Sequence, residues 1–484
     1  MSKQNGGIIG PNNIPTGAFG SASGVWKLSD AINYKRQGTW PVVLNNFQVD
    51  NSARFNSGSS DYLSTTTGTA TNTDKCTISF WVKRGFKASG DHKIIANYTD
   101  DSNRCFIFIT GDNQFQIFQK LGGSTTISLK TNRLFKDFSA WYHFVIRVDT
   151  SQGTDTNRIK LYINGVQETS FATTTYPSQN ENFRINESSV SLNIGRPGTD
   201  TEYFNGYLSE FVLLDGQTLD ATSFGEFDSQ TGIWVPKIVT GLTFGNNGFY
   251  LDFQNSGALG TDVSGNGNNF TVNNLTSIDQ SIDTCTNNFA TLNPIYKSSS
   301  QPTFSEGNLR QAPNAGTYQN AFSTIGVSSG KWYAEMKVNG SANSANYYGV
   351  VAETEYDYLQ TAANVVGTTD KGFSIAMASG DKRTNGSNTS YGSALANTDI
   401  FMIALDIDNA KVWFGKNGTW FASGNPASGS NAAFSSINTA YPYFFGGTLY
   451  SGGYSSVDWN FSSPSYAISS GNVDSSGLGN FEYP

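Results

Sequence analysis

The chain has 484 residues, of which only 14% are charged, against roughly 25% in an average soluble domain. Ser, Thr, Asn and 51 Gly therefore supply most of the polar surface. This composition is poor in helix formers and rich in turn and strand formers, so it excludes a helical bundle and favours several β-rich domains. The net charge of −8 is spread along the chain without a Lys/Arg cluster, which predicts that nucleic acid is not a partner.

The chain contains no run of about 18 apolar residues that would cross a membrane. Its Gly/Asn/Ser-rich first residues lack the apolar segment of a secretion signal. Cys76, Cys105 and Cys285 have no metal-ligand spacing. Cys76 and Cys105 lie in predicted strands that could meet across a sheet, but we expect buried, reduced thiols rather than a disulfide. We therefore expect a protein that is made in a reducing cytoplasm and is not secreted by the Sec route.

Residues 1–45 are predicted to form an extended N-terminal arm that carries one short helix. In residues 28–38, Ser29 can cap the first turn and Gly38 can end the helix. Two or three turns alone are unstable in water, so this helix must dock on another surface. The residues that offer it an apolar face are Trp26, Leu28, Ile32, Tyr34 and Trp40.

From about residue 46 the apolar residues alternate with a period of two, as they do in half-buried strands. The segment 76–83 (CTISFWVK) is the clearest example. Asn164-Gly165 lies between two such segments and is typical of a two-residue hairpin turn. Repeated short strands with no helix between them predict an antiparallel sandwich over residues 46–237.

Residues 238–300 are predicted to be a connector with strand fragments. A second β-rich block covers residues 301–470, and a short tail covers residues 471–484. Asn417-Gly418 marks a second hairpin inside that block. The predicted fold class is all-β, with two tandem antiparallel β-sandwich (jelly-roll) domains behind the extended N-terminal arm.

The strand sequences of the first block resemble those of laminin-G/concanavalin-like lectin domains. The resemblance rests on 76–83 (CTISFWVK), 141–149 (WYHFVIRVD), 158–166 (RIKLYINGV) and 193–214 (NIGRPGTDTEYFNGYLSEFVLL), which occur in the order of that family. It implies a jelly-roll fold, and this fold hosts lectins, hydrolases and structural modules.

The second block is similar to SPRY domains. The similar segments are 331–336 (KWYAEM), 349–352 (GVVA), 400–421 (IFMIALDIDNAKVWFGKNGTWF) and 443–446 (YFFG). This resemblance implies a binding module whose loops hold a protein or peptide partner.

The arm and the connector are similar to tail or fibre proteins of aquatic bacteriophages. The similarity lies in residues 7–41 (with GIIGPNN and SASGVWKLSDAINYKRQGTWP) and in residues 206–293 (with SFGEFDSQTGIWVPK and GFYLDFQNSGALGTDVSGNGNNFTVNNL). It implies a protein of the virion surface that is assembled in the bacterial cytoplasm and contacts other virion proteins through its arm. It also implies a homo-oligomer, with a trimer as the usual state of phage fibres.

Groups suited to catalysis are few, and we expect that the protein is not an enzyme. His92 and His143 are interpreted as core or surface residues rather than as general bases. A concanavalin-like hydrolase needs paired carboxylates that flank the glycosidic bond. The nearest candidates are Glu226 with Asp228, and Glu353 with Glu355 and Asp357. For the second group we favour a solvated strand face or loop.

Binding is expected at aromatic residues in polar loops, because sugar rings stack on aromatic faces while backbone and amide groups hold their hydroxyls. The candidate ligand-binding residues are Tyr356, Tyr358, Tyr391, Tyr450 and Tyr454. No cofactor is expected. Calcium stays open as an alternative at residues 262–268 (DVSGNGN), which offer oxygens at alternate positions, and at Asp50 or Asp61.

These observations lead to one main hypothesis and two alternatives. The main hypothesis is a bacteriophage virion protein of the tail-fibre or receptor-binding type, which binds a host-surface glycan or protein through its sandwich loops. The first alternative is a capsid decoration or head-fibre protein with a mainly structural role. The second is a polysaccharide depolymerase that uses the carboxylates named above.

Overall fold

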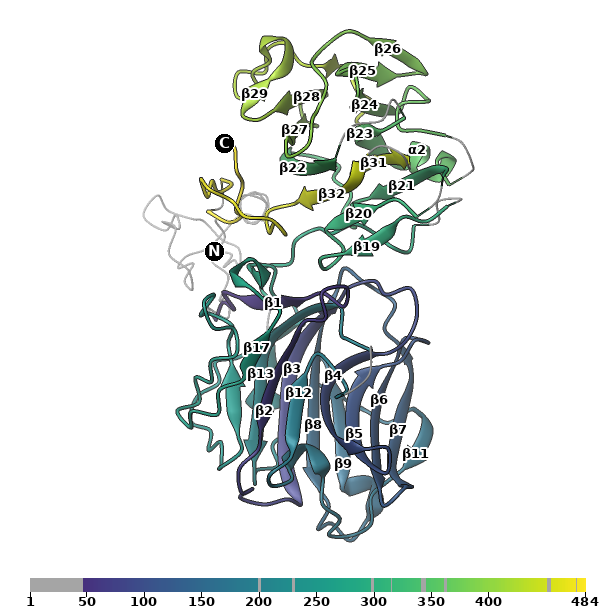
Figure 1. Ribbon diagram of the computed structural model, residues 1–484. Helices are drawn as coiled ribbons and strands as arrows, with labels where there is room; N and C mark the ends of the chain where they lie inside the picture. The colour runs from purple at the N-terminus through teal and green to yellow at the C-terminus, as the bar shows by residue number, and fades with distance from the viewer. Residues whose placement is uncertain are drawn as a thin grey trace, which may run out of the picture.

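A computed structural model describes residues 47–198, 202–228, 231–296, 300–314, 316–340, 345–360, 364–450, 454–475 and 477–484. Two β-sandwiches lie end to end in these residues (Figure 1). The predicted all-β fold with antiparallel sheets is confirmed. The anchoring residues predicted in the arm, Trp26, Leu28, Ile32, Tyr34 and Trp40, lie outside the described residues.

Two sheets build the first sandwich. One runs in the order β10 (Val166–Glu168), β9 (Ile159–Ile163), β8 (Trp141–Asp149), β3 (Lys75–Arg84), β13 (Gly206–Asp215), β1 (Ser52–Phe55) and β18 (Gln280–Ser281), with β16 (Phe249–Leu251) also beside β13. The other runs in the order β11 (Phe171–Thr175), β7 (Ser124–Leu134), β6 (Gln114–Leu121), β5 (Asn103–Ile109), β4 (His92–Asp100), β12 (Ser191–Ile194), β2 (Tyr62–Thr66) and β17 (Thr271–Asn273).

The core of the first sandwich follows from the alternation in β3. Ile78, Phe80 and Val82 are fully buried in one apolar cluster. The ring of Phe80 stacks on Phe211 with centroids 5.0 Å apart. The hairpin signal is also confirmed, since Asn164-Gly165 joins β9 to β10 and both residues have positive φ, 47° and 80°.

The second sandwich also has two sheets. One runs in the order β19 (Thr303–Ser305), β20 (Arg310–Ala312), β32 (Tyr454–Asn460), β22 (Lys331–Gly340), β27 (Ile400–Asp406), β28 (Lys411–Lys416) and β29 (Thr419–Trp420), with β30 (Phe434–Ser435) beside β28. The other runs in the order β21 (Tyr318–Phe322), β31 (Tyr443–Tyr450), β23 (Tyr347–Ala352), β24 (Gly372–Ala376), β25 (Asp381–Thr384) and β26 (Ser387–Thr389). The short helix α2 (Glu353–Tyr358) follows β23.

Several small elements complete the two units. One-turn 3-10 helices occur at Asp155–Asn157, Arg184–Asn186, Ala221–Ser223, Ser277–Asp279 and Phe421–Ser423. The hairpin of β14 (Gly225–Phe227) and β15 (Trp234–Pro236) packs through Trp234 on the first sandwich. Near the C-terminus, the backbone N–H groups of Glu482 and Tyr483 donate to the carboxylate of Glu335 at 3.0 and 2.8 Å, which holds the tail against β22.

Much of the predicted connector belongs to the first sandwich. Strand β16 pairs with β13, β17 with β2 and β18 with β1. These strands have only two or three residues each, and a pattern of period two cannot be recognised over so short a length. The first sandwich therefore extends well beyond the boundary predicted at residue 237.

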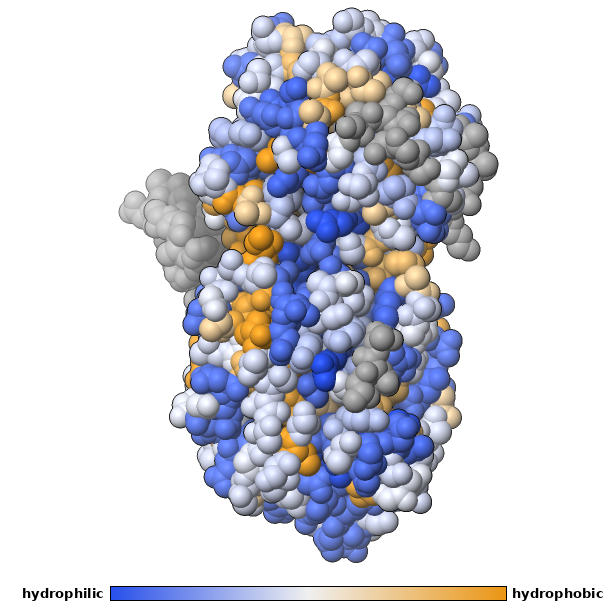
Figure 2. All heavy atoms as spheres, in the orientation of Figure 1, coloured by the Kyte–Doolittle hydropathy of each residue, from blue (hydrophilic) through white to orange (hydrophobic). Residues whose placement is uncertain are grey.

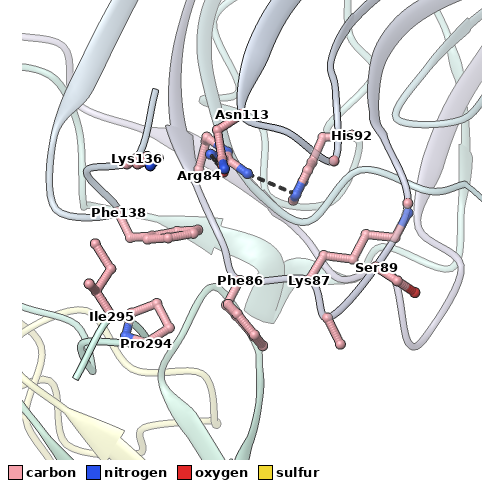
Figure 3. Close-up of a pocket in the computed structure, with 13 residues that line it drawn as sticks. Arg84, Phe86, Lys87, Ser89, His92, Asn113, Lys136, Phe138, Pro294 and Ile295 are labelled. Carbon is pink, nitrogen blue, oxygen red and sulfur yellow. Dashed lines mark hydrogen bonds between the residues drawn. The ribbon is translucent and has the colours of Figure 1, made fainter. Parts of the chain in front are cut away.

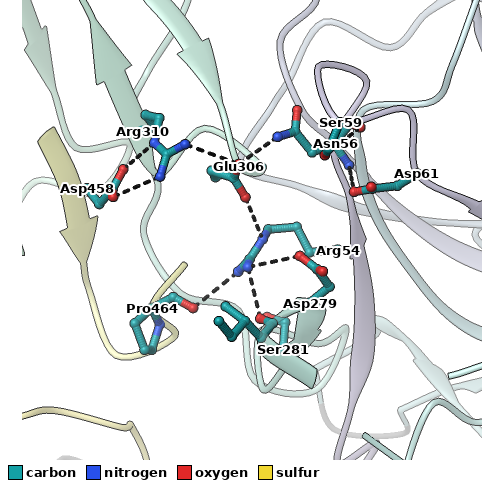
Figure 4. A network of polar contacts seen from close by, with 12 residues as sticks. Arg54, Asn56, Ser59, Asp61, Asp279, Ser281, Glu306, Arg310, Asp458 and Pro464 are labelled. Carbon is teal, nitrogen blue, oxygen red and sulfur yellow. Dashed lines mark hydrogen bonds and ion pairs between the residues drawn. The ribbon is translucent and has the colours of Figure 1, made fainter. Parts of the chain in front are cut away.

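A polar network joins the two sandwiches (Figure 4). The side chain of Arg54 is fully buried and donates to the carbonyl oxygens of Ile278, at 2.9 Å, and of Pro464, at 3.1 Å. The same guanidinium lies 3.3 Å from the carboxylate of Asp279 and 3.7 Å from that of Glu306. Since Glu306 and Pro464 flank strands of the second sandwich, this network fixes one sandwich on the other.

The surface is polar, as the composition suggests. Figure 2 shows a mostly hydrophilic face, with apolar residues gathered near the level at which the sandwiches meet. Within the described ranges, no helix has the length and apolar character needed to cross a membrane.

Candidate functional site

An open pocket of about 320 Å³ lies at the end of the first sandwich that faces the second (Figure 3). Its walls come from the loops between β3 and β4 and between β5 and β6, from the loop that follows β7, and from the segment that enters the second sandwich. The lining residues are Arg84, Phe86, Lys87, Ala88, Ser89, Gly90, His92, Gly111, Asn113, Lys136, Phe138, Pro294 and Ile295.

Arg84 forms the floor of this pocket. It is 3% exposed and donates to Asn113 Oδ1 at 2.7 Å and to the carbonyl oxygen of Phe135. Its guanidinium lies 4.9 Å from the ring centre of Phe138, within the range of a cation–π contact. Burial lowers the pKa of Arg84 to about 10, so the side chain stays charged at neutral pH.

His92 lies beside Arg84, with Nε2 3.3 Å from the guanidinium (Figure 3). Burial, and then the positive charge of Arg84, hold the pKa of His92 well below its usual range. The imidazole is therefore neutral, and Nε2 accepts the hydrogen bond from Arg84. His92 thus orients the floor of the pocket and has no proton to donate to a ligand at this nitrogen.

Two lysines add positive charge at the rim. Lys87 donates to the carbonyl oxygens of Asp91 and Tyr203, at 2.8 and 3.2 Å, and burial lowers its pKa. The carboxylates nearest to it belong to Asp91 and Glu202, and both pair with Lys93, at 2.8 and 3.2 Å. Lys136 is exposed and has no ion pair among the described residues.

The pocket therefore combines cations with aromatic faces. The rings of Phe86 and Phe138 lie 6.2 Å apart, and the loop between β3 and β4 adds a hydroxyl at Ser89 and an open backbone at Gly90. Such a surface can bind a polyhydroxylated ligand that carries negative charge, because ammonium groups form strong hydrogen bonds to anionic oxygens and the rings stack on apolar faces of sugars.

The five tyrosines predicted as ligand-binding residues do not come together. Tyr356 and Tyr358 lie in α2, which follows Ala352 of β23, and Ala352 pairs with Tyr443 at the start of β31. Tyr450 ends β31, so it lies at the opposite end of that strand. It contacts Tyr318 with ring centres 5.3 Å apart.

The predicted loop position is wrong for Tyr356 and Tyr358, which lie in α2, for Tyr450, which lies in β31, and for Tyr454. Tyr454 begins β32, is 1% exposed and belongs to the core of the second sandwich. Tyr356 packs on Tyr296, with ring centres 4.2 Å apart, and Tyr391 packs against Phe421. Tyr358, at 43% exposure, presents the most open ring of the set.

His143 is a core residue, as interpreted from the sequence. Its ring stacks between Trp81 and Trp234, with centroids 4.6 and 6.0 Å away. Nε2 lies 2.8 Å from Ser79 Oγ, and Nδ1 accepts from Trp234 Nε1 at 3.0 Å. Burial lowers the pKa of His143 to about 3, so the ring is neutral and shielded from substrate.

The carboxylates considered for hydrolysis also lie outside the pocket. Glu226 is exposed on β14, and Asp228 accepts from the backbone and hydroxyl of Thr231, both at 2.7 Å. Glu353, Glu355 and Asp357 lie in α2, so the favoured strand face or loop is wrong for this segment. Glu355 is buried and accepts from the backbone of Gly367 at 3.0 Å and from the hydroxyl of Thr369.

The possible calcium ligands are engaged by the chain. The Asp262 carboxylate accepts from the backbone N–H groups of Tyr250, Ser264 and Asn268 at 2.8 to 2.9 Å, which organises the turn. Asp61 is buried and accepts from the backbone of Asn56 at 2.8 Å, whereas Asp50 is exposed. In the part of the chain that the structure describes, no three His, Cys, Asp or Glu residues converge as a metal site.

Sequence reasoning missed the pocket, although a signal was present. Residues 83–87 (KRGFK) interleave cations with an aromatic residue at the end of β3 and in the loop that follows, and Lys136 and Phe138 repeat the pairing after β7. The cysteines lie where they were expected, since Cys76 and Cys105 are buried without a disulfide and Cys285 is half-buried and free.

Comparison with known protein families gives a match within the first sandwich. Residues 57–222 match the family described as the concanavalin A-like lectin/glucanases superfamily. No curated protein sequence matches the chain.

Solved structures with a similar fold include the SPRY domain of human HERC1 (20% identity, 31% of this chain and 87% of that chain, TM-score 0.26). Others are a putative carbohydrate-binding protein from Bacteroides ovatus (15% identity, 47% and 59%, TM-score 0.33) and a pentraxin from Limulus polyphemus (14% identity, 36% and 79%, TM-score 0.26). The chain therefore contains a lectin-like sandwich at residues 57–222, and it has SPRY domains among its structural neighbours.

Proposed function

We propose that this protein binds an acidic glycan on a bacterial surface, without catalysis, as a bacteriophage virion protein of the tail-fibre or receptor-binding type. The observation that carries the proposal is the pocket whose lining combines Lys87 and Lys136 with the rings of Phe86 and Phe138. The lectin-like fold of residues 57–222 supports it.

An acidic glycan suits this pocket better than a neutral one. Lys136 is exposed beside the cavity, and a carboxylate or sulfate on the ligand would give it a partner. Arg84 is charged at the floor of the pocket, where Asn113, Phe135 and His92 accept from its terminal nitrogens and hold the guanidinium in place. The ligand would therefore gain attraction from a cation that needs no rearrangement.

The proposed place of the protein on a particle rests on its architecture and on its resemblance to phage fibres. The arm of residues 1–45 would contact other virion proteins, and the sandwiches would project outward. A trimer is proposed for this assembly, as is usual in phage fibres. Non-catalytic binding is proposed because the candidate carboxylates lie apart from the pocket, with Glu355 buried under Gly367 and Thr369.

The first experiment measures binding of the purified full chain to an array of acidic and neutral bacterial oligosaccharides, with and without calcium chelation. Ala88→Trp places an indole at the pocket rim, and Ala172→Trp on the exposed face of β11 is the matched control. We expect retention of acidic sugars by the wild type and the control, and loss of retention in Ala88→Trp. Retention of none of the sugars, or equal retention by both variants, would refute the proposed site.

The virion role is tested separately by competition. The purified protein is added to host bacteria before the phage whose genome encodes the chain. Blocked adsorption is the expected result. If the cells remain unprotected while antibodies label the capsid of intact particles, the protein is a capsid decoration and the receptor-binding proposal fails.

A further inference from the structure

A polar cluster at the end of β3 brings a buried lysine into contact with a buried acid and an exposed amide. The Lys83 side chain is fully buried at the end of β3. Its Nζ donates to Asp283 Oδ2 at 2.7 Å and to Asn288 Oδ1 at 2.8 Å. A third hydrogen bond, of 2.9 Å, reaches the carbonyl oxygen of Phe289. Asp283 and Asn288 both lie in the segment that leads from β18 toward the second sandwich.

Aromatic side chains enclose this cluster. Trp141 Nε1 donates to Asp283 Oδ1 at 2.9 Å, and the Tyr207 ring centre lies 5.8 Å from Lys83 Nζ. Asp283 is 1% exposed. An ion pair in such surroundings is costly, because both charges are removed from water. Burial is the main cause that raises the pKa of Asp283, which favours the protonated form of this carboxyl.

A neutral amine is a nucleophile, and the Asn288 amide is the electrophile next to it. The amide carbon lies one C=O bond, about 1.2 Å, beyond the oxygen that Lys83 contacts. Asn288 Nδ2 donates to the carbonyl oxygen of Ser139 at 2.8 Å, which holds the amide in place. Asn288 is itself exposed, so an ammonia molecule released there can leave to solvent.

We propose that Lys83 and Asn288 become joined by an intramolecular isopeptide bond, with Asp283 as the proton carrier. Asp283 takes a proton from the Lys83 ammonium, and the resulting amine attacks Asn288 Cγ. Asp283 then returns that proton to the leaving nitrogen, and the departing ammonia takes up the second proton, which the attacking nitrogen releases as the tetrahedral intermediate collapses. The bond formed is Nζ–Cγ and the bond broken is Cγ–Nδ2. One lysine ammonium and one amide give one substituted amide and one ammonium ion, so no oxidant or other reactant is needed.

The position of the bond gives it a mechanical consequence. Strand β3 lies inside its sheet, between β8 and β13. Strands β16 and β18 are short, and they are paired with the first sandwich before the chain enters the second. A covalent tie at residue 288 would pass a pull on the second sandwich directly to β3, and the short strands would carry no load.

The test is mass spectrometry of the denatured wild-type chain after trypsin digestion. We expect residues 76–84 and 238–297 in one branched peptide that is lighter by one ammonia than the sum of the two. We also expect no cleavage after Lys83. Lys93 is the internal control, because its ammonium pairs with the carboxylates of Asp91 and Glu202, and cleavage there is expected to proceed.

Two variants assign the groups. Asn288→Leu removes the electrophile and Lys83→Arg removes the amine, so both are expected to give two separate peptides. Recovery of two separate peptides from the wild type, with or without loss of ammonia elsewhere, would overturn the proposal and leave a buried hydrogen-bonded ammonium. A branched peptide that has lost water instead would place the bond at Asp283 and overturn the assignment of Asn288.

Discussion

The joint between the sandwiches and the pocket beside it use the same kinds of side chain in opposite ways. At the joint, Arg54 is fully buried and two carboxylates and two carbonyl oxygens of the chain surround it. At the pocket, Lys136 is exposed and faces a cavity. A cation whose partners all come from the chain stabilises the fold, whereas a cation left beside a cavity is available to a ligand.

The backbone at the joint is also tightly constrained. Glu306, Gly307 and Asn308 at the joint all have left-handed φ values, 53°, 62° and 68°. Gly307 lies against Tyr207, where an added Cβ would come within 2.3 Å of the ring, and its carbonyl oxygen accepts from the Tyr207 hydroxyl at 3.1 Å. The joint thus holds one fixed geometry, which also positions the pocket wall formed by Pro294 and Ile295.

The largest loss of stability is expected from Arg54→Met. Removal of the guanidinium takes away the cation that pairs with Asp279 and leaves Glu306 with Arg310 alone, at 3.5 Å. Breaking a buried ion pair in this way typically costs about 3–5 kcal/mol of the free energy of unfolding. Urea unfolding of the full chain measures it. Arg104→Met is the control, since Arg104 pairs with the exposed Asp101 at 2.7 Å, and a change below about 1 kcal/mol is expected there. Equal losses in the two variants would contradict the structural role of Arg54.

A smaller effect on the free energy of unfolding is expected from Asp61, which also lies at the joint. A buried carboxyl loses its charge when it takes up a proton, so its burial then costs less. Burial, with Asp279 and Glu306 as nearby negative charges, raises the pKa of Asp61 to about 6, whereas its unfolded value is about 3.9. Between these values the folded state binds more protons, so this group makes the free energy of unfolding fall as pH rises from about 4 to about 6. Asp61→Asn should remove that fall and stabilise the protein at neutral pH. Parallel pH dependences of the wild type and the variant would contradict this.

Phe86 belongs to both regions and tests whether they are coupled. Its ring lies 5.8 Å from that of Phe304 in the second sandwich and 6.2 Å from that of Phe138 in the pocket. Because the ring is half-buried, Phe86→Ala is expected to cost about 2 kcal/mol, less than a fully buried phenylalanine. It should also weaken glycan binding. The half-buried Phe171 of β11 provides the control, since Phe171→Ala should lower stability and leave binding unchanged.

The sequence predicted the fold well where strands are long. The alternation in residues 76–83 and the Asn-Gly turns place β3, β9 and β28 correctly, because period and turn chemistry act over neighbouring residues. It could not predict that β16, β17 and β18 complete the first sandwich. Their pairing partners β13, β2 and β1 lie far away along the chain, and strands of two or three residues show no period.

The candidate site was harder to predict, because exposure is decided by tertiary packing. Tyr454 reads as a loop residue among Gly and Ser, yet its ring enters the core of the second sandwich. Lys136 reads as an ordinary surface lysine. Only the fold brings it to the same cavity as Lys87 and Phe86, about 50 residues earlier in the chain.

The smallest change in stability, with the most specific change in binding, is expected from Lys136→Glu. An exposed substitution of this kind changes stability by less than about 0.5 kcal/mol. Loss of one hydrogen bond to a charged group should weaken binding of an acidic oligosaccharide about tenfold or more.

Lys237→Glu makes the same charge change at an exposed position outside the pocket, so it separates local contact from net charge. Titration at low and high salt completes the measurement, because the wild-type affinity should fall with salt and the Lys136→Glu affinity should change less. Equal weakening by both variants would mean that overall charge, rather than the pocket, attracts the ligand.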